Sequence, residues 1–146
     1  MTKVLLVYAS MSGNTEEMAD FIEKGLLKAG MEVNKQEVVD IDASEMEDYS
    51  HIMLGAFTWG DGDLPDEFLD FHEDMEEMDL SDKFFAIFGS GDTMYEIYCG
   101  AVDILEETVK KCNGNIVLES LKIESYPDDE EMCINFGTQF ANVLVK

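Results

Sequence analysis

The chain has 146 residues, of which 46% are hydrophobic, so we expect one compact domain spanning 1–146 with a buried core. Its 33 acidic residues face nine lysines and no arginine, which gives a formal net charge of −24. This charge disfavours binding to DNA, RNA or anionic lipid, all of which present phosphates, and it favours protein partners with basic surfaces.

Five stretches of the chain have the composition of β-strands. Residues 4–8, 52–57 and 84–88 are continuously apolar, as strands are when helices cover both faces of a parallel sheet. Residues 32–38 and 116–123 mix polar with apolar side chains, which suits the two edges of a sheet. The first run is shorter than the apolar core of a signal peptide, about 7–15 residues, and we interpret it as a strand.

Helical patterns separate the strands. Apolar side chains recur at helical spacing in four segments, 15–29, 65–78, 98–112 and 128–145. In the last segment the apolar stripe consists of Met132, Phe136, Phe140 and Val143. Strands and helices that alternate in this way predict a doubly wound α/β fold: a five-stranded parallel sheet of order 2-1-3-4-5 with helices on both faces.

Ligands of doubly wound sheets bind beyond the carboxyl ends of the strands, where strands one and three diverge. The segment after the first strand is rich in small polar residues and runs into a helix, whose free N–H groups can bind a phosphate. Its residues are Ser10, Met11, Ser12, Gly13, Asn14 and Thr15. An ordinary polar turn with a helix-capping residue is the alternative. The segment lacks the lysine of a Walker loop, which argues against nucleoside triphosphates.

The segment after the third strand contains Trp59, the one tryptophan of the chain, between polar and glycine residues. A position at the carboxyl end of a strand favours an exposed platform for ring stacking, and a buried core residue is the alternative. The acids nearby do not have the spacing of an EF-hand calcium loop. The sequence therefore predicts an aromatic contact for a ligand at this strand end.

The segment after the fourth strand, 89–95, begins with two glycines that allow backbone amides to approach a planar ring closely. Tyr95 can supply a second aromatic face, or it can be a half-buried surface residue. Met94 stands where a dinucleotide-binding fingerprint requires its last glycine, so that fingerprint is incomplete. One phosphate loop and two aromatic residues on neighbouring loops together predict a pocket for a flat ring with a phosphorylated tail.

These motifs resemble those of flavodoxins, and the resemblance extends over essentially the entire chain. The motifs are Ser10-x-Ser12-Gly13-Asn14-Thr15, Thr58-Trp59-Gly60-Asp61, Gly89-Ser90-Gly91-Asp92-x-x-Tyr95 and Tyr98-Cys99-Gly100-Ala101-Val102-Asp103. Because the fifth strand carries no long insertion, the chain resembles the short-chain, FMN-binding bacterial branch. The resemblance implies a flavodoxin-like fold and one non-covalently bound FMN.

The resemblance also implies which residues hold the cofactor. Residues 10–15 would bind the FMN phosphate, and Trp59 and Tyr95 would stack on the two faces of the isoalloxazine ring. Backbone groups of 90–92 would meet the pyrimidine edge, and the peptide between Gly60 and Asp61 would turn its carbonyl toward a protonated flavin N5. The expected contacts are Ser10, Met11, Ser12, Gly13, Asn14, Thr15, Phe57, Thr58, Trp59, Gly60, Asp61, Ser90, Gly91, Asp92, Tyr95 and Cys99.

Two positions depart from the family pattern. Phe57 stands where many relatives carry a small residue that helps to hold the phosphate, a role in which Thr58 can replace it. Met94 occupies a position that is often small and polar, so one hydrogen bond to the flavin is lost or comes from the backbone. Both departures would lower FMN affinity modestly.

By the same resemblance the chain is a low-potential one-electron carrier, not an enzyme, without catalytic or metal-binding residues. A carboxylate about 10 Å from a reduced, negatively charged flavin costs about 1.7 kcal/mol, or about 70 mV, at an effective dielectric near 20. The potential of the flavin would therefore be lowered by the nearby acids Asp61, Asp63, Asp66, Glu67 and Asp92. The ten acids within 61–79 favour a recognition face for a basic partner, and a merely solvated helix face is the alternative. The expected partners are redox proteins with basic docking surfaces, a donor and an acceptor, in transient complexes with a monomeric chain.

Three other function classes are less well supported. An FMN-dependent NAD(P)H:quinone reductase with this fold is the main alternative, but it needs a nicotinamide or quinone pocket built from longer loops or a dimer. A phosphorylatable receiver needs carboxylates after the first strand and an aspartate ending the third, where the chain has Ser10 and Phe57. A hydrolase lacks support because neither His51 nor His72 belongs to a recognisable nucleophile arrangement.

The cysteines bear on the compartment. Cys99, Cys112 and Cys133 form no C-x-x-C pair and cannot all pair with one another. Free thiols indicate a reducing compartment, and no segment approaches the roughly 20 apolar residues of a membrane span. We therefore expect a cytoplasmic protein.

Overall fold

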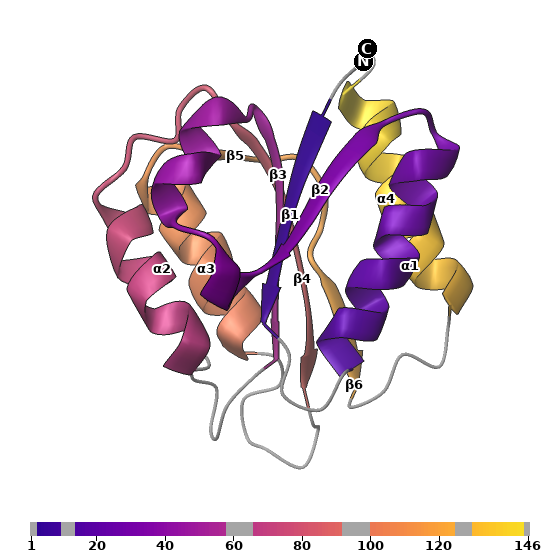
Figure 1. Cartoon of the computed structure of the whole chain (residues 1–146), viewed down its shortest axis with the longest axis horizontal. Helices are drawn as coiled ribbons and strands as arrows, with labels where there is room; N and C mark the ends of the chain where they lie inside the picture. Colours follow the sequence, from indigo (N-terminus) through magenta and orange to yellow (C-terminus); the bar gives the residue numbers. More distant parts are fainter. Residues whose placement is uncertain (1–2, 10–13, 58–65, 92–99, 125–129, 145–146) are drawn as a thin grey trace.

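The computed structural model describes residues 3–9, 14–57, 66–91, 100–124 and 130–144 (Figure 1). Its strands are β1 (Lys3–Ala9), β2 (Glu32–Glu37), β3 (His51–Phe57), β4 (Phe84–Gly91), β5 (Asn115–Ile116) and β6 (Leu121–Glu124). Its helices are α1 (Asn14–Lys28), α2 (Asp66–Glu76), α3 (Gly100–Lys111) and α4 (Glu130–Leu144), with short 3₁₀ helices η1 (Val38–Asp40) and η2 (Ala43–Asp48). The strands form one parallel sheet in the order β2-β1-β3-β4-β5, and β6 also pairs with β4.

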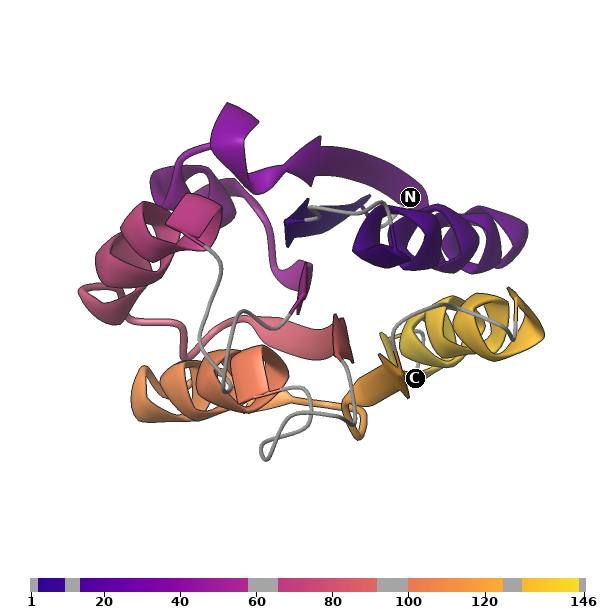
Figure 2. The same cartoon turned by 90° about the horizontal axis from the view of Figure 1, so that it is seen from below.

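Helices cover both faces of the sheet, α1 and α4 on one face and α2 and α3 on the other (Figure 1 and Figure 2). Successive residues of β1 alternate between these two layers, because side chains of a strand point to opposite faces in turn. Leu5 and Val7 belong to the core beneath α2 and α3, whereas Val4 and Leu6 belong to the core beneath α1 and α4. The continuous apolar run that predicted this strand therefore reflects burial on two faces.

The predicted strand order and the double layer of helices are confirmed. Each of the four helices begins and ends within two residues of its expected bounds. Glycine and proline positions and the apolar spacing were sufficient to place them, because both signals are local. The 3₁₀ helices η1 and η2 were not predicted. Among the described residues, no helix is long and apolar enough to cross a membrane.

The expected fifth strand, 116–123, is in fact two short strands. β5 pairs with Phe84 and Phe85 of β4, and β6 resumes the pairing at Phe88. Four residues, 117–120, thus lie opposite only two residues of β4, and the two extra residues leave the ladder. The Ser120 hydroxyl donates a hydrogen bond to Glu106 Oε2 over 2.7 Å, which holds the segment against α3.

Of the apolar stripe expected on α4, the two phenylalanines are buried as predicted, but its first and last members are exposed. Met132 is 47% exposed and Val143 is 37% exposed, whereas Cys133, Phe136 and Phe140 are buried. The cause is a close approach between α1 and α4: a Cβ atom added to Gly137 would lie 2.3 Å from the Ile22 carbonyl oxygen. The helix turns its small residue toward α1, and this contact rotates Met132 and Val143 toward solvent.

Candidate functional site

Four strands end side by side, at what we call the carboxyl edge of the sheet. Ala9 of β1 is the register partner of Ala56, Phe57 of β3 is that of Ser90, and Gly91 of β4 is that of Glu124. Figure 2 looks onto this edge, where the helices also begin. The chain segments that follow β1, β3 and β4 therefore leave from neighbouring points.

The strands β1, β3 and β4 carry small residues just before this edge. Ala9 and Ala56 are buried, and a Cβ atom added to Gly89 would lie 2.4 Å from the Ala56 carbonyl oxygen and 2.4 Å from Val102 Cγ2. Because no side chain at position 89 fits here, the Gly89 backbone packs directly on the Ala56 backbone and on the Val102 side chain. This packing fixes the positions from which the Phe57 and Ser90 peptides leave the sheet.

Helix α1 begins at the carboxyl edge, within the last two residues of the segment expected to bind phosphate. Asn14 is its first residue, and the next residue, Thr15, is fully buried although its side chain is polar. The free N–H groups of a helix N-terminus and the positive end of the helix dipole favour a bound anion. The described residues of this edge thus fit a phosphorylated ligand.

The predicted contact residues divide into two groups. Asn14 and Thr15 start α1, Phe57 ends β3 half-buried against the core, and Ser90 and Gly91 end β4, so the fold brings these five to one edge. The remaining predicted contacts lie outside the described residues. They are Ser10, Met11, Ser12, Gly13, Thr58, Trp59, Gly60, Asp61, Asp92, Tyr95 and Cys99.

The carboxyl edge is strongly acidic. The first turn of every α-helix carries carboxylates: Glu16 and Glu17 on α1, Asp66 and Glu67 on α2, Asp103 on α3, and Glu130 and Glu131 on α4. Two described lysines are paired with acids of this group, Lys24 with Glu130 at 3.7 Å and Lys122 with Asp103 at 2.7 Å. Other lysines lie in the last turns of α1 and α3, at the opposite edge.

Tyr8 illustrates how this charge acts on a nearby group. Its side chain is buried in β1, one residue before the end of the strand. Burial, reinforced by Glu16, Glu37 and Asp20, raises the pKa of Tyr8 to about 12, and Lys35 only partly offsets the shift. Lys35 itself is held by Asp20 and by Glu23. Although burial alone would lower the pKa of Lys35, these two carboxylates raise it.

Sequence reasoning missed one polar network, between α2 and α3. His72 Nε2 lies 2.7 Å from the Thr108 hydroxyl oxygen, and the two residues are 36 positions apart in the chain. Helical spacing within one segment does not predict a contact between two helices. The one sequence signal was the acid at i+4, Glu76, on the same face of α2 as His72. Among the described residues, no group of three His, Cys, Asp or Glu side chains is arranged to hold a metal ion.

Known proteins resemble this chain over nearly its whole length. The family model described as Flavodoxin matches residues 6–137. "Probable flavodoxin 2" of Bacillus subtilis (strain 168) is 61% identical over 144 residues, which are 97% of this chain and 95% of that protein. Oxidised Flavodoxin 1 from Bacillus cereus has a TM-score of 0.93 at 46% identity, over 97% of this chain and 98% of the other. Oxidised Flavodoxin 2 from Bacillus cereus has a TM-score of 0.88 at 47% identity, over 99% and 98%.

Proposed function

The chain belongs to the flavodoxin family, and from this premise we propose that it holds FMN at the carboxyl edge and passes electrons at low potential to and from proteins with basic surfaces. Flavodoxins are electron-transfer flavoproteins, so the chain is an FMN-binding carrier and not an enzyme. The alternative of a quinone reductase is not favoured. As a carrier, the chain exchanges electrons with redox partners.

The proposed FMN site uses the three segments that leave the carboxyl edge. Residues 10–15 bind the phosphate at the start of α1, Trp59 and Tyr95 enclose the ring, and 90–92 meet its pyrimidine edge. The remaining contacts come from Phe57, Thr58, Gly60, Asp61 and Cys99. The fully buried Thr15 at the first turn of α1 and the adjacent ends of β3 and β4 support this assignment. When bound, FMN supplies the one-electron chemistry, and these residues hold and orient it.

The low potential is proposed from one observation, the ring of acids in the first turns of all four helices. Each of these carboxylates disfavours an added negative charge at the edge by tens of millivolts, since one at about 10 Å costs about 70 mV before screening. The described lysines near the ring are already paired with its acids. A flavin bound at this edge therefore has a low reduction potential and donates its electrons readily.

The same acids support the proposed docking surface. A partner that approaches the carboxyl edge meets carboxylates on every side, so a surface rich in lysine or arginine is attracted and steered toward it. Transient complexes of a monomeric, one-domain chain fit this role, because the net charge of −24 opposes self-association. Cys112 and Cys133 are buried and neither is joined in a disulfide, which supports the reducing cytoplasm as the compartment.

The experiment that tests the site is a titration of the apoprotein with FMN, followed by visible absorption and by flavin fluorescence. We expect one FMN per chain. Trp59→Ala should weaken binding about fivefold to a hundredfold, because stacking contributes about 1–3 kcal/mol per face. Trp59→Phe keeps a ring and should lose much less, and Leu69→Ala removes an apolar side chain that is 48% exposed on α2 and should change nothing. Equal affinity in Trp59→Ala would contradict the stacking role.

A second experiment tests the charge argument. Neutralising Asp66 and Glu67 together, as Asp66→Asn and Glu67→Gln, should raise the potential for full reduction by tens of millivolts and weaken the salt dependence of electron transfer to a basic haem protein. Glu32→Gln with Asp82→Asn removes equal charge at the opposite edge, beside the starts of β2 and β4, and should have a smaller effect. NADPH oxidation by the purified protein alone would favour the quinone reductase instead.

A further inference from the structure

Helix α3 ends at an asparagine in the left-handed backbone conformation. Asn113 has a φ of +69°, and among the residues that the structure describes it is the one residue other than glycine with a positive φ. Its N–H donates to the Lys110 carbonyl over 3.1 Å, and the N–H of Gly114 donates to the Val109 carbonyl over 2.8 Å. These two bonds form a Schellman cap, which satisfies carbonyl groups in the last turn of the helix.

Both positions of this cap are restricted in residue type. Glycine, asparagine and aspartate are the residues that adopt a positive φ routinely, which limits the choice at position 113. At position 114 an added Cβ atom would lie 2.6 Å from Val109 Cγ1 and 3.2 Å from a ring carbon of Phe85, so glycine fits without displacing these side chains. The fold thus places an asparagine directly before a glycine, the one Asn-Gly pair of the chain.

An Asn-Gly pair can react within itself, because glycine has no side chain to hinder the approach of the two groups. Hydroxide removes the proton of the Gly114 main-chain nitrogen, and this nitrogen attacks Cγ of Asn113. A C–N bond forms and closes a five-membered succinimide, while the bond from Cγ to Nδ2 breaks. Nδ2 leaves as ammonia after taking a proton from water, which regenerates hydroxide. Water then opens the ring at either carbonyl and yields aspartate or isoaspartate, without any exchange of electrons.

The closed cap prevents this reaction in two ways. The left-handed conformation brings the Asn113 Cβ atom next to its own carbonyl oxygen, and therefore away from the Gly114 nitrogen on the other side of the carbonyl carbon. The proton that hydroxide must remove is also committed to the Val109 carbonyl. Because the Asn113 side chain is exposed, water reaches it without any movement of the core. The reaction therefore requires the cap to open, but it does not require the protein to unfold.

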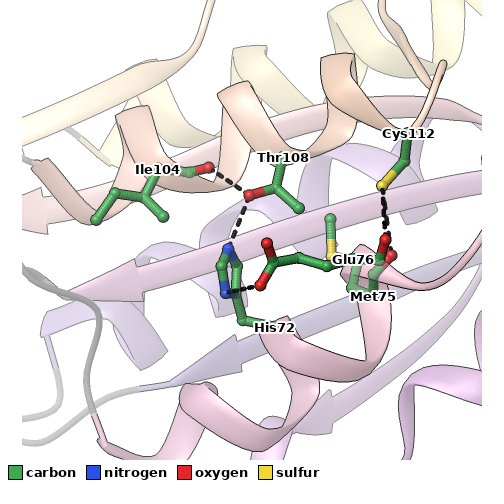
Figure 3. A network of polar contacts seen from close by, with 6 residues as sticks. All are labelled: His72, Met75, Glu76, Ile104, Thr108 and Cys112. Atoms are coloured by element: carbon green, nitrogen blue, oxygen red, sulfur yellow. Dashed lines mark hydrogen bonds and ion pairs between the residues drawn. The ribbon is translucent and has the colours of Figure 1, made fainter.

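On the helix side the cap is fastened to α2 and to the segment after it. Cys112 directly precedes Asn113, and its buried thiol donates to the Met75 carbonyl over 3.4 Å (Figure 3). The Cys112 carbonyl accepts a hydrogen bond from the N–H of Leu80 over 2.8 Å. These contacts do not involve Asn113 or Gly114, so they hold the last turn of α3 in place while the cap opens.

On the strand side the cap is fastened by Asn115, the first residue of β5. Its side-chain amide donates to the carbonyls of Ser81 and Lys83, over 3.1 and 3.0 Å. Its N–H also donates to the Lys83 carbonyl, over 3.1 Å. Removal of the side-chain amide therefore loosens the cap on this side, while the main-chain bond and the contacts of α3 remain.

We propose that Asn113 is a site of covalent modification, which converts to aspartate or isoaspartate through a succinimide when the cap of α3 opens. Isoaspartate adds a methylene group to the main chain, so the two bonds of the cap cannot form again. Aspartate keeps the main chain but places a carboxylate at the negative end of the helix dipole. Both products weaken this end of α3, which lies at the edge of the sheet opposite the carboxyl edge. FMN affinity is therefore unaffected.

The test follows the conversion of Asn113 in the full chain at mildly alkaline pH with FMN present. Peptide mapping by mass spectrometry measures the rate in buffer and in urea that unfolds the protein. We expect the folded chain to react about tenfold to a hundredfold more slowly than the unfolded chain, because opening breaks the hydrogen bonds of the cap. Asn113→Gly keeps the positive φ and has no side-chain amide, so conversion at this position should disappear.

Matched variants separate opening of the cap from unfolding of the whole chain. Asn115→Ala removes the two side-chain bonds on the strand side, and the ratio of its folded rate to its rate in urea should rise about tenfold over that of the parent. Thr138→Val removes a hydroxyl that reaches the Gly25 carbonyl of α1 over 3.4 Å, on the other face of the sheet. This variant lowers stability without touching the cap, and its ratio should equal that of the parent.

An ageing experiment measures the consequence of the reaction. Parent protein stored in buffer should unfold at a lower urea concentration than fresh protein, with unchanged FMN affinity, whereas stored Asn113→Gly should behave as when fresh. The proposal is overturned if Asn113 does not convert in urea, if the folded and unfolded chains react at equal rates, or if Thr138→Val accelerates the reaction as much as Asn115→Ala. An equal loss of stability in stored Asn113→Gly would also overturn it.

Discussion

Gly89 and Ala56 lie in such close contact that a Cβ atom on Gly89 would stand 2.4 Å from the Ala56 carbonyl oxygen. Both residues belong to the last part of their strands, next to the carboxyl edge. Gly89→Ala would therefore push β4 away from β3, or from Val102 of α3, next to the segments proposed to bind FMN. We expect a loss of about 3 kcal/mol in the free energy of unfolding together with weaker FMN binding, measured by urea unfolding and by FMN titration.

Gly30→Ala provides the control for this substitution. Gly30 has a φ of +88° and no atom within 4 Å of an added Cβ, so its cost is backbone strain alone, about 1 kcal/mol. It lies at the end of α1 away from the carboxyl edge, and FMN affinity should be unchanged. Equal losses for the two variants would show that steric contact at Gly89 is unimportant.

The contact between α1 and α4 leads to a second prediction. An added Cβ on Gly25 would lie 2.0 Å from the Ile134 carbonyl oxygen, and one on Gly137 would lie 2.3 Å from that of Ile22. Alanine favours an isolated helix by about 1 kcal/mol over glycine, but here each substitution should destabilise the protein by about 2 kcal/mol, since the helices must move apart.

Urea unfolding of the two single variants and the double variant checks this argument. Once one methyl group has separated the helices, the second adds little, so the double variant should lose less than the sum of the singles. Asn142→Ala, at an exposed position of α4, should be neutral or slightly stabilising. A stabilising Gly25→Ala would mean that helix propensity outweighs packing at this interface.

The raised pKa of Tyr8 leads to a prediction about protein stability at alkaline pH. The folded pKa of Tyr8, about 12, lies above the value near 10 of an unfolded tyrosine. Its contribution to the free energy of unfolding is therefore complete below about pH 10 and is lost as the pH rises through 12. Tyr8→Phe keeps the ring and cannot ionise. We expect the parent to lose up to about 2 kcal/mol more stability than the variant across this window, as measured by urea unfolding at successive pH values. Parallel curves would rule out the raised pKa.

The lowered pKa of Glu106 leads to a prediction about protein stability at acidic pH. Hydrogen bonds from Ser120 and Lys110 lower the pKa of Glu106, so its contribution to stability is present above the unfolded value and is lost as the pH falls through the folded pKa. Ser120→Ala should cost about 1 kcal/mol at neutral pH, and this difference should shrink below the unfolded value of about pH 4.3. Ser44→Ala, at an exposed position of η2, should show no such dependence in acid unfolding experiments.

The parts of the fold that could be predicted from the sequence rest on local signals. The apolar runs around Leu5, Leu54 and Ile87 are buried on both faces of the sheet. Because continuously apolar runs are typical of central strands, the sequence placed these three at the centre. The parts that were missed depend on contacts between distant segments. The interruption at 117–120 arises from a mismatch in length with β4, and the exposure of Met132 arises from the contact of Gly137 with α1.

The candidate site divides in the same way. The common carboxyl edge could be predicted from the strand order, and the fold brings Thr15, Phe57 and Ser90 there. The acids at the helix starts are visible in the sequence, but their common location follows only from the fold. The contact between His72 and Thr108 depends on how α2 and α3 face one another, which no spacing along the chain encodes.

The measurement that tests the central claim most directly is amide hydrogen exchange of the apoprotein with and without saturating FMN. We predict one FMN per chain and slower exchange at the first turn of α1 and at the last residues of β3 and β4, around Thr15, Phe57 and Ser90. Leu118, Met132 and Phe136 line a separate groove of about 480 Å³ between α4 and the segment before β6. Absence of FMN binding, or protection confined to that groove, would contradict the account.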